Sequence, residues 1–159
     1  MTRDPIRLQR ILDEKEHDTY RIKGKLAEPT VCPKCHAVYH KGHWQWLDIP
    51  DGADEHKCPA CLRIEDNVPC GYVSISGAFY KQHKEEIMGL IRSKENREKT
   101  GHPLNRIMNI SETADGLEIT TTDMHLPRDI GVALEHAYDG ELDYHYESES
   151  NILRVKWSR

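Results

Sequence analysis

Four of the five cysteines stand in two C-x2-C pairs, a spacing typical of metal ligands. The pairs are CPKC at residues 32–35 and CPAC at residues 58–61, with 22 residues between them. Two residues between cysteines allow a tight turn that presents both sulfurs to one ion, and four thiolates complete a tetrahedral zinc shell. We therefore expect one structural Zn2+, held by Cys32, Cys35, Cys58 and Cys61.

The same cysteines could in principle form redox pairs or an iron site, but two matched pairs favour zinc. Four protein sulfurs leave no coordination position for water, so hydrolytic zinc catalysis is not expected. The fifth cysteine, Cys70, has no partner at this spacing. It is either a small buried apolar residue, which we favour, or an accessible thiol.

Aromatic and basic residues lie close in sequence to the first cysteine pair. Imidazole and indole rings can stack on bases, and lysine and arginine can neutralise phosphates. The residues predicted to contact RNA or another partner are Arg3, Arg7, Arg10, Lys23, Lys25, Lys34, Lys41, His43, Trp44 and Trp46. In the alternative interpretation, both tryptophans cover a small zinc core, and the cations, which alternate with acids, form a solvated face.

A second polar group, Thr122, Asp123 and His125, stands where a predicted strand leads into a helix. Asp123 as the helix N-cap is the simpler interpretation. The other is a second contact site, where the helix N-terminus receives a phosphate or a partner carboxylate. The chain has no G-x-S-x-G, Walker or G-x-G-x-x-G motif. We expect no enzyme; catalysis by Asp123 and His125 is a third, less favoured hypothesis.

The elements that position these residues follow from hydrophobic periodicity and turn residues. We expect an N-terminal helix (5–16) and arm within residues 1–29, a zinc ribbon at 30–71 and an α+β domain at 72–159. The ribbon contains two short strands that turn at Lys41-Gly42. The remaining predicted elements are a strand at 72–76, a helix at 79–99, strands at 104–111 and 117–121, a helix between Asp123 and Asp139, and strands at 142–146 and 153–157.

The order β-α-β-β-α-β-β predicts an α+β fold, a small antiparallel sheet with two helices on one face, ferredoxin-like or similar. The apolar faces of these elements should meet in one core. Its expected members are Phe79, Ile87, Leu90, Ile130, Leu134, Leu142, Tyr144, Val155 and Trp157.

The charge of the 159-residue chain is unevenly distributed. The total is −5, but segments 1–47 and 71–110 each carry +3, whereas segments 48–70 and 111–159 carry −4 and −7. A polyanion should therefore meet the first or third segment. No apolar run approaches the length of a membrane helix, and the N-terminus has no apolar signal region, so we expect a cytoplasmic protein without membrane contact.

The segments EPTVCPKCHAVYHKGHWQW, CPACLRI and ITTTDMHLPRDIGVAL resemble small bacterial proteins related to the nonsense-mediated-decay-type ribosome adaptor, whose eukaryotic members serve large-subunit export. The resemblance implies zinc binding through Cys32, Cys35, Cys58 and Cys61 and association with the large ribosomal subunit. The larger adaptors carry further C-x-x-C pairs and β domains that this chain lacks. A bacterium has no nucleus, so export is not the implied role.

The leading hypothesis is a non-enzymatic zinc protein that binds the ribosome, through ribosomal RNA or ribosomal proteins of the large subunit. It would affect ribosome stability or silence translation under stress. The ribbon and N-terminal arm would contact RNA, and the acidic C-terminal half would face solvent or a basic protein. The alternative is a zinc-stapled protein–protein adaptor with no nucleic-acid role, which the negative net charge favours.

Overall fold

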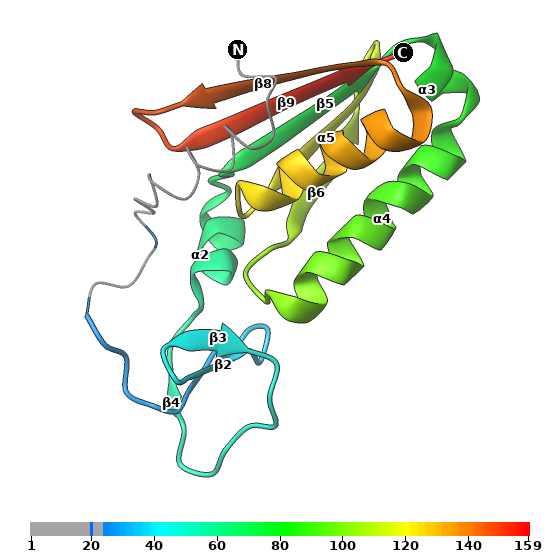
Figure 1. Cartoon of the computed structure of the whole chain (residues 1–159). Helices are drawn as coiled ribbons and strands as arrows, with labels where there is room; N and C mark the ends of the chain where they lie inside the picture. Colours follow the sequence, from blue (N-terminus) through cyan, green and yellow to red (C-terminus); the bar gives the residue numbers. More distant parts are fainter. Residues whose placement is uncertain (1–19, 21–23) are drawn as a thin grey trace.

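The computed structural model describes residue 20 and residues 24–159, so the predicted helix at 5–16 lies outside the described residues. Two modules follow one another along the molecule (Figure 1). The small module contains a four-stranded sheet and the cysteines of both pairs. In the large module, helices α4 (Lys84–Gly101) and α5 (His125–Tyr138) cover one face of a five-stranded sheet (Figure 1). The α+β class is therefore confirmed.

The small module is built around the predicted hairpin. Strands β2 (Val38–His40) and β3 (His43–Gln45) pair antiparallel, and Lys41 and Gly42 between them both have positive φ, at 51° and 83°. Two such residues are typical of the two-residue turns that match the twist of a hairpin. The sheet order is β3-β2-β1-β4, with strands β1 (Thr30–Val31) and β4 (Asp54–Glu55). Because β4 runs parallel to β1, this sheet is mixed.

Helix α2 (Pro59–Asp66) begins at the second cysteine pair and was not predicted. The Sγ atom of Cys58 caps the helix by accepting the N–H of Cys61, and Pro59 occupies the first turn, where its missing N–H costs nothing. Asn67 ends the helix in the left-handed conformation. Two turns of helix are too short to show a clear apolar stripe, so the sequence pattern indicated only a metal knuckle here.

The large module follows the predicted order, with one helix divided in two. His83 leaves the helical region at φ −121° and ψ 28°, and its ring stacks on Phe79 with centroids 4.1 Å apart. No proline or glycine marks this break, so periodicity predicted one continuous helix. The other elements are β5 (Gly71–Ser76), α3 (Ala78–Gln82), β6 (Ile107–Glu112), β7 (Gly116–Thr121), β8 (Glu141–Glu147) and β9 (Ile152–Ser158).

The predicted antiparallel sheet is wrong at one pairing. The strand order is β6-β7-β5-β9-β8, and β5 runs parallel to β9 from Gly71 opposite Leu153 to Ser76 opposite Ser158. In a ferredoxin-like sheet, the strand after the second helix would lie beside β5. Here β8 takes the edge, and the hairpin returns β9 into the sheet, so β9 lies beside β5 in the same direction. The sheet is therefore mixed.

The predicted core is largely confirmed. Seven of its nine members are buried, and Phe79 and Leu90 are partly buried and pack against them. Gly131 lets α5 approach the sheet closely, because a Cβ atom there would lie 2.7 Å from Val155 and 2.8 Å from Leu142. Cys70 is also buried, and its thiol donates to the carbonyl of Asn151, which agrees with the favoured interpretation of this residue. Within the described part of the chain, no helix combines the length and apolarity that crossing a membrane requires.

Candidate metal centre

The two cysteine pairs meet in space. Cys32 follows β1, Cys35 lies in the turn before β2, and Cys58 and Cys61 lie at the start of α2. Their four Sγ atoms all lie within 4.8 Å of one another, and those of Cys35 and Cys58 are 3.7 Å apart. A tetrahedral site with Zn–S of about 2.3 Å has sulfur–sulfur edges of about 3.8 Å. The cluster is therefore compatible with one structural Zn2+.

Backbone N–H groups point at the sulfurs. The N–H of Cys58 donates to Sγ of Cys32 at 3.3 Å, and that of Cys61 donates to Sγ of Cys58 at 3.4 Å. The first turn is closed by two backbone bonds of 2.9 Å, from Cys32 N to Ala37 O and from His36 N to Cys32 O. These donors favour thiolates over thiols, and thiolates are the form that binds metal.

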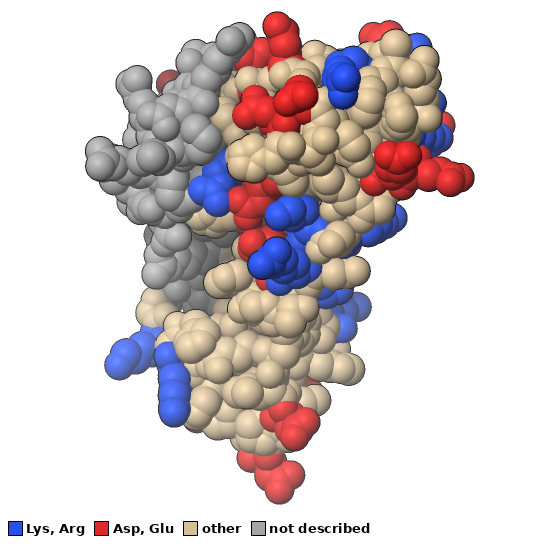
Figure 2. All heavy atoms as spheres, turned by 45° about the vertical axis from the view of Figure 1, so that its right-hand side comes forward, with Lys and Arg blue, Asp and Glu red and all other residues tan. Residues whose placement is uncertain are grey.

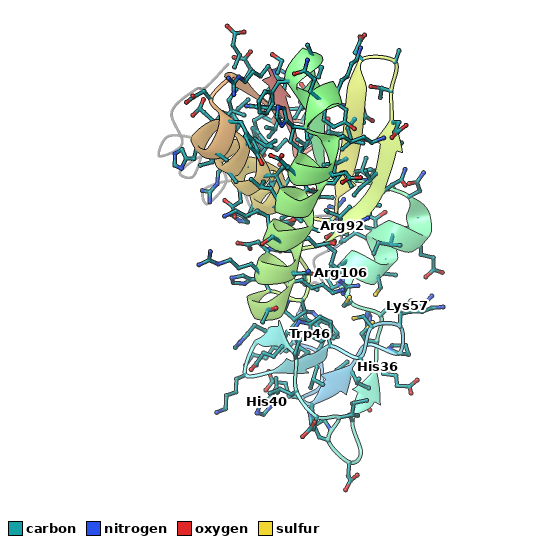
Figure 3. The ribbon with its side chains drawn as sticks, turned by 90° about the vertical axis from the view of Figure 1, so that its right-hand side faces the viewer. His36, His40, Trp46, Lys57, Arg92 and Arg106 are labelled. Carbon is teal, nitrogen blue, oxygen red and sulfur yellow. The ribbon has the colours of Figure 1, made fainter. Side chains whose placement is uncertain are left out.

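Arg106 of the large module completes the centre. Its guanidinium donates to three sulfurs, at 3.3 Å to Cys61, 3.1 Å to Cys35 and 3.3 Å to Cys58. Its Nε atom donates to the carbonyl of Pro103 at 2.7 Å, and the residue is only 7% exposed. Figure 3 shows Arg106 between the lower end of α4 and the small module. Sequence analysis missed this residue, because a single arginine within a predicted strand carries no metal-site signal.

The charges of the centre are complementary. Four thiolates around Zn2+ carry a net charge of −2, and the guanidinium reduces it to −1 in a site largely shielded from water. Burial by itself lowers the pKa of Arg106, but the hydrogen bond to Cys61 and the sulfurs of Cys35 and Cys58 raise it above its ordinary value. The hydrogen bond between Cys35 and Cys58 lowers the pKa of Cys35 to about 4 and raises that of Cys58. Arg106 is therefore a permanent cation beside the sulfurs.

Thr122 holds the backbone of Arg106 in place. The backbone N–H of Arg106 donates to Oγ1 of Thr122, and the N–H of Thr122 donates to the carbonyl of Arg106, each at 2.9 Å. The Thr122 hydroxyl also donates to the carbonyl of Leu104 at 2.6 Å. This residue was predicted as a possible partner contact, and the structure places it in the interior, where it orients Arg106.

The neighbouring Asp123 caps α5. Its Oδ2 atom accepts the N–H groups of His125 and Leu126 at 2.9 and 3.0 Å, as the simpler interpretation of this residue expected. Its Oδ1 atom is buried and has no hydrogen-bond partner among the described residues. Burial, opposed by the two N–H donors, raises the pKa of Asp123 to about 7. His125 is partly buried at the start of the helix.

Among the described residues, those predicted to contact RNA differ in exposure. Those outside the described residues are Arg3, Arg7, Arg10 and Lys23. Those with exposed side chains are Lys25, Lys34, Lys41 and His43. Trp44 is only 9% exposed and packs edge-on against Tyr39 with ring centroids 5.5 Å apart. This position favours the alternative in which Trp44 covers the zinc core.

Trp46 behaves differently from Trp44. It is 38% exposed, and its indole N–H donates to the carbonyl of Lys99, in the last turn of α4, at 2.6 Å. Figure 3 shows it below the end of that helix. Together with His36, Leu47 and Asp48, it lines an open hollow on the surface. Trp46 therefore joins the small module to the large one and still offers part of its ring to solvent.

Comparison with known proteins identifies no family. What the structure supports is a four-cysteine cluster consistent with a zinc-binding motif. No family model, no curated protein and no solved structure matches this chain.

Proposed function

We propose that this chain is a non-enzymatic zinc protein that associates with the ribosome, through RNA or proteins of the large subunit, and affects ribosome stability or translational silencing under stress. The observation that carries the proposal is the closed geometry of the cysteine cluster. Four sulfurs fill a tetrahedral shell, and Arg106 covers three of them. Such an ion has no position for a reacting water, so its role is structural.

The small module offers exposed cations for a polyanionic partner. Lys34 lies in the first cysteine turn, and Lys41 and His43 lie at the β2–β3 turn, at one edge of the sheet. The acidic β4 strand forms the opposite edge. Figure 2 shows basic and acidic side chains at separate places on this lower part of the molecule. Segregated charge supports binding of phosphates at the β2–β3 side.

Two measurements test the proposal. Elemental analysis of protein purified without chelator should find one zinc per chain, and Cys35→Ser should remove it. The tagged protein should sediment with the large ribosomal subunit at low salt and leave it as salt rises, because phosphate contacts release counterions. Protein that holds zinc but never enters the subunit fractions would exclude the ribosomal part of the proposal.

A protein–protein adaptor is the second candidate. Four apolar side chains of the small module and the segment after it are exposed by more than 40%, which is a feature of interaction sites. They are Leu47, Ile49, Ile64 and Val68. This candidate predicts binding with little salt dependence and a loss of partner when Ile49 or Ile64 is replaced by serine. Lys34→Gln with Lys41→Gln would leave such binding unchanged, which separates the two candidates.

A further inference from the structure

The second half of α4, whose last turn contacts Trp46, is rich in basic residues. From Arg92 to Gly101 the helix has four basic and two acidic residues. The side chains of Arg92 and Lys99 are exposed and, seven residues apart, lie on the same face of the helix. The carbonyl of Lys99 is the group that holds the Trp46 indole. Figure 3 shows Arg92 and Trp46 along the same side of the molecule.

The two acids of this half-helix are half-buried and hydrogen-bonded to the segment that follows it. The Oε2 atom of Glu95 accepts the backbone N–H of Ile107 at 2.6 Å, and Glu98 accepts the side-chain amide of Asn105 at 3.3 Å. The Glu95 side chain is only 15% exposed, and its other oxygen lies 3.7 Å from Arg92. Both carboxylates therefore hold the segment after α4, and the exposed charge of this half-helix is positive.

The exposed part of Trp46 is an apolar ring without a free donor. The indole N–H already donates a hydrogen bond to the carbonyl oxygen of Lys99, so the ring offers a partner its π-face rather than a hydrogen bond. A flat ring beside cations is what single-stranded nucleic acids require, since bases stack on aromatic rings while phosphates meet lysine and arginine. An acidic protein segment would use the cations but gain little from the ring.

We propose that Trp46, Arg92 and Lys99, here called the Trp46–α4 surface, bind a single-stranded RNA segment. The indole stacks on a base, and the two cations contact phosphates along about 10 Å of helix. The inference rests on the proposed RNA association and moves its centre from the N-terminal cations to a surface shared by both modules.

Binding of a short fluorescein-labelled oligouridylate, followed by anisotropy over a range of salt concentrations, tests the surface. The test variant combines Arg92→Gln and Lys99→Gln. The slope of log affinity against log salt should become shallower by about 1.4, because each single-strand phosphate contact contributes about 0.7. A matched control removes the same charge at exposed positions in other elements: Lys81→Gln and Lys156→Gln. The control should bind nearly as the unmodified protein does.

Trp46 has its own readout. Trp46→Ala should weaken oligouridylate binding about 5- to 150-fold, the loss of one base–aromatic stack. Trp46→Phe also loses the bond to Lys99 but keeps a ring, so it should retain most of the affinity. Because Trp44 and Trp157 are buried, oligouridylate should also quench the emission of Trp46 in the unmodified protein. A purely structural Trp46 would give neither the difference between Phe and Ala nor the quenching.

The outcomes separate this inference from the proposed function. If the α4 variant and Trp46→Ala bind RNA normally, while Lys25→Gln, Lys34→Gln and Lys41→Gln together weaken binding, RNA association holds and the Trp46–α4 surface is refuted. If the unmodified protein binds neither oligouridylate nor the large subunit, both proposals fail. Poly-L-glutamate serves as a second probe, a model of an acidic protein. If the α4 variant loses binding of poly-L-glutamate but keeps binding of oligouridylate, the surface binds an acidic protein, which also overturns the inference.

Discussion

Replacement of Arg106 by glutamine should damage the metal centre. The guanidinium donates to three sulfurs at 3.1–3.3 Å and is 7% exposed. Glutamine removes both the charge and the fork of donors, and it leaves the −2 charge of a zinc tetrathiolate without its buried cation. Loss of one partner of a buried ion pair costs about 3–5 kcal/mol. Loss of a group that hydrogen-bonds metal ligands weakens metal affinity about 10–100-fold.

Zinc competition against a chromophoric chelator and urea unfolding followed by circular dichroism measure the two effects. Arg106→Lys keeps the charge but cannot reach three sulfurs with one ammonium group, so its losses should be intermediate. Arg92→Gln is the control, because it removes the same charge from an exposed position whose recorded ion pair is the 3.7 Å contact with Glu95. If Arg106→Gln binds zinc and unfolds like Arg92→Gln, the sulfur contacts contribute nothing and the reasoning fails.

Three further predictions concern stability. Cys35→Ser should release the metal and, by hydrogen exchange, expose the backbone of the small module and the Arg106 segment together; exchange confined to the small module would contradict the Arg106 link. Leu134→Ala, in the core of α5, should lower the free energy of unfolding by about 2–5 kcal/mol in urea titrations, and a loss below 1 kcal/mol would contradict its burial. The raised pKa of Asp123, about 7, means that the folded chain binds the proton more tightly than the unfolded chain, so this group favours folding at low pH and its contribution is lost between about pH 4 and 7. Asp123→Asn keeps an oxygen to cap α5 and should remove that part of the pH dependence; identical pH–stability curves would refute the assignment.

Local patterns predicted much of the fold and the ligand set. The C-x2-C spacing indicates metal ligands, because two intervening residues are enough to place two sulfurs on one ion. The hairpin at Lys41-Gly42 follows from Gly42, which adopts positive φ without strain. The large-module strands follow from alternation of apolar residues such as Leu153, Val155 and Trp157. In each case the information lies within a few neighbouring residues.

Long-range pairings were not predictable in the same way. Alternation shows that β9 has a buried face, but it does not say that β9 lies beside β5 or runs parallel to it. The Arg106 contact joins residues 45 to 71 positions apart in the sequence, and the sequence around Arg106 looks like the start of an ordinary strand. Trp46 and Trp44 stand two residues apart, yet Trp44 is buried in the cluster around the cysteines, whereas Trp46 lies beyond the end of β3, against the carbonyl of Lys99, and is partly exposed.

The same contacts make the metal centre relevant to the Trp46–α4 surface. Two side-chain contacts join the modules near this surface, Arg106 to the sulfurs and Trp46 to the carbonyl of Lys99. The segment from His102 to Arg106 connects them, because it follows α4 directly and is held by Glu98 and Thr122. Loss of metal would remove the ion that holds the four sulfurs together, so the buried guanidinium would lose the fixed positions of its three acceptors. Movement of Arg106 would disturb the end of α4, on which Trp46 rests. We therefore expect a bound zinc ion to stabilise the small module and also to fix the distance between the ring and the cations that we propose bind RNA.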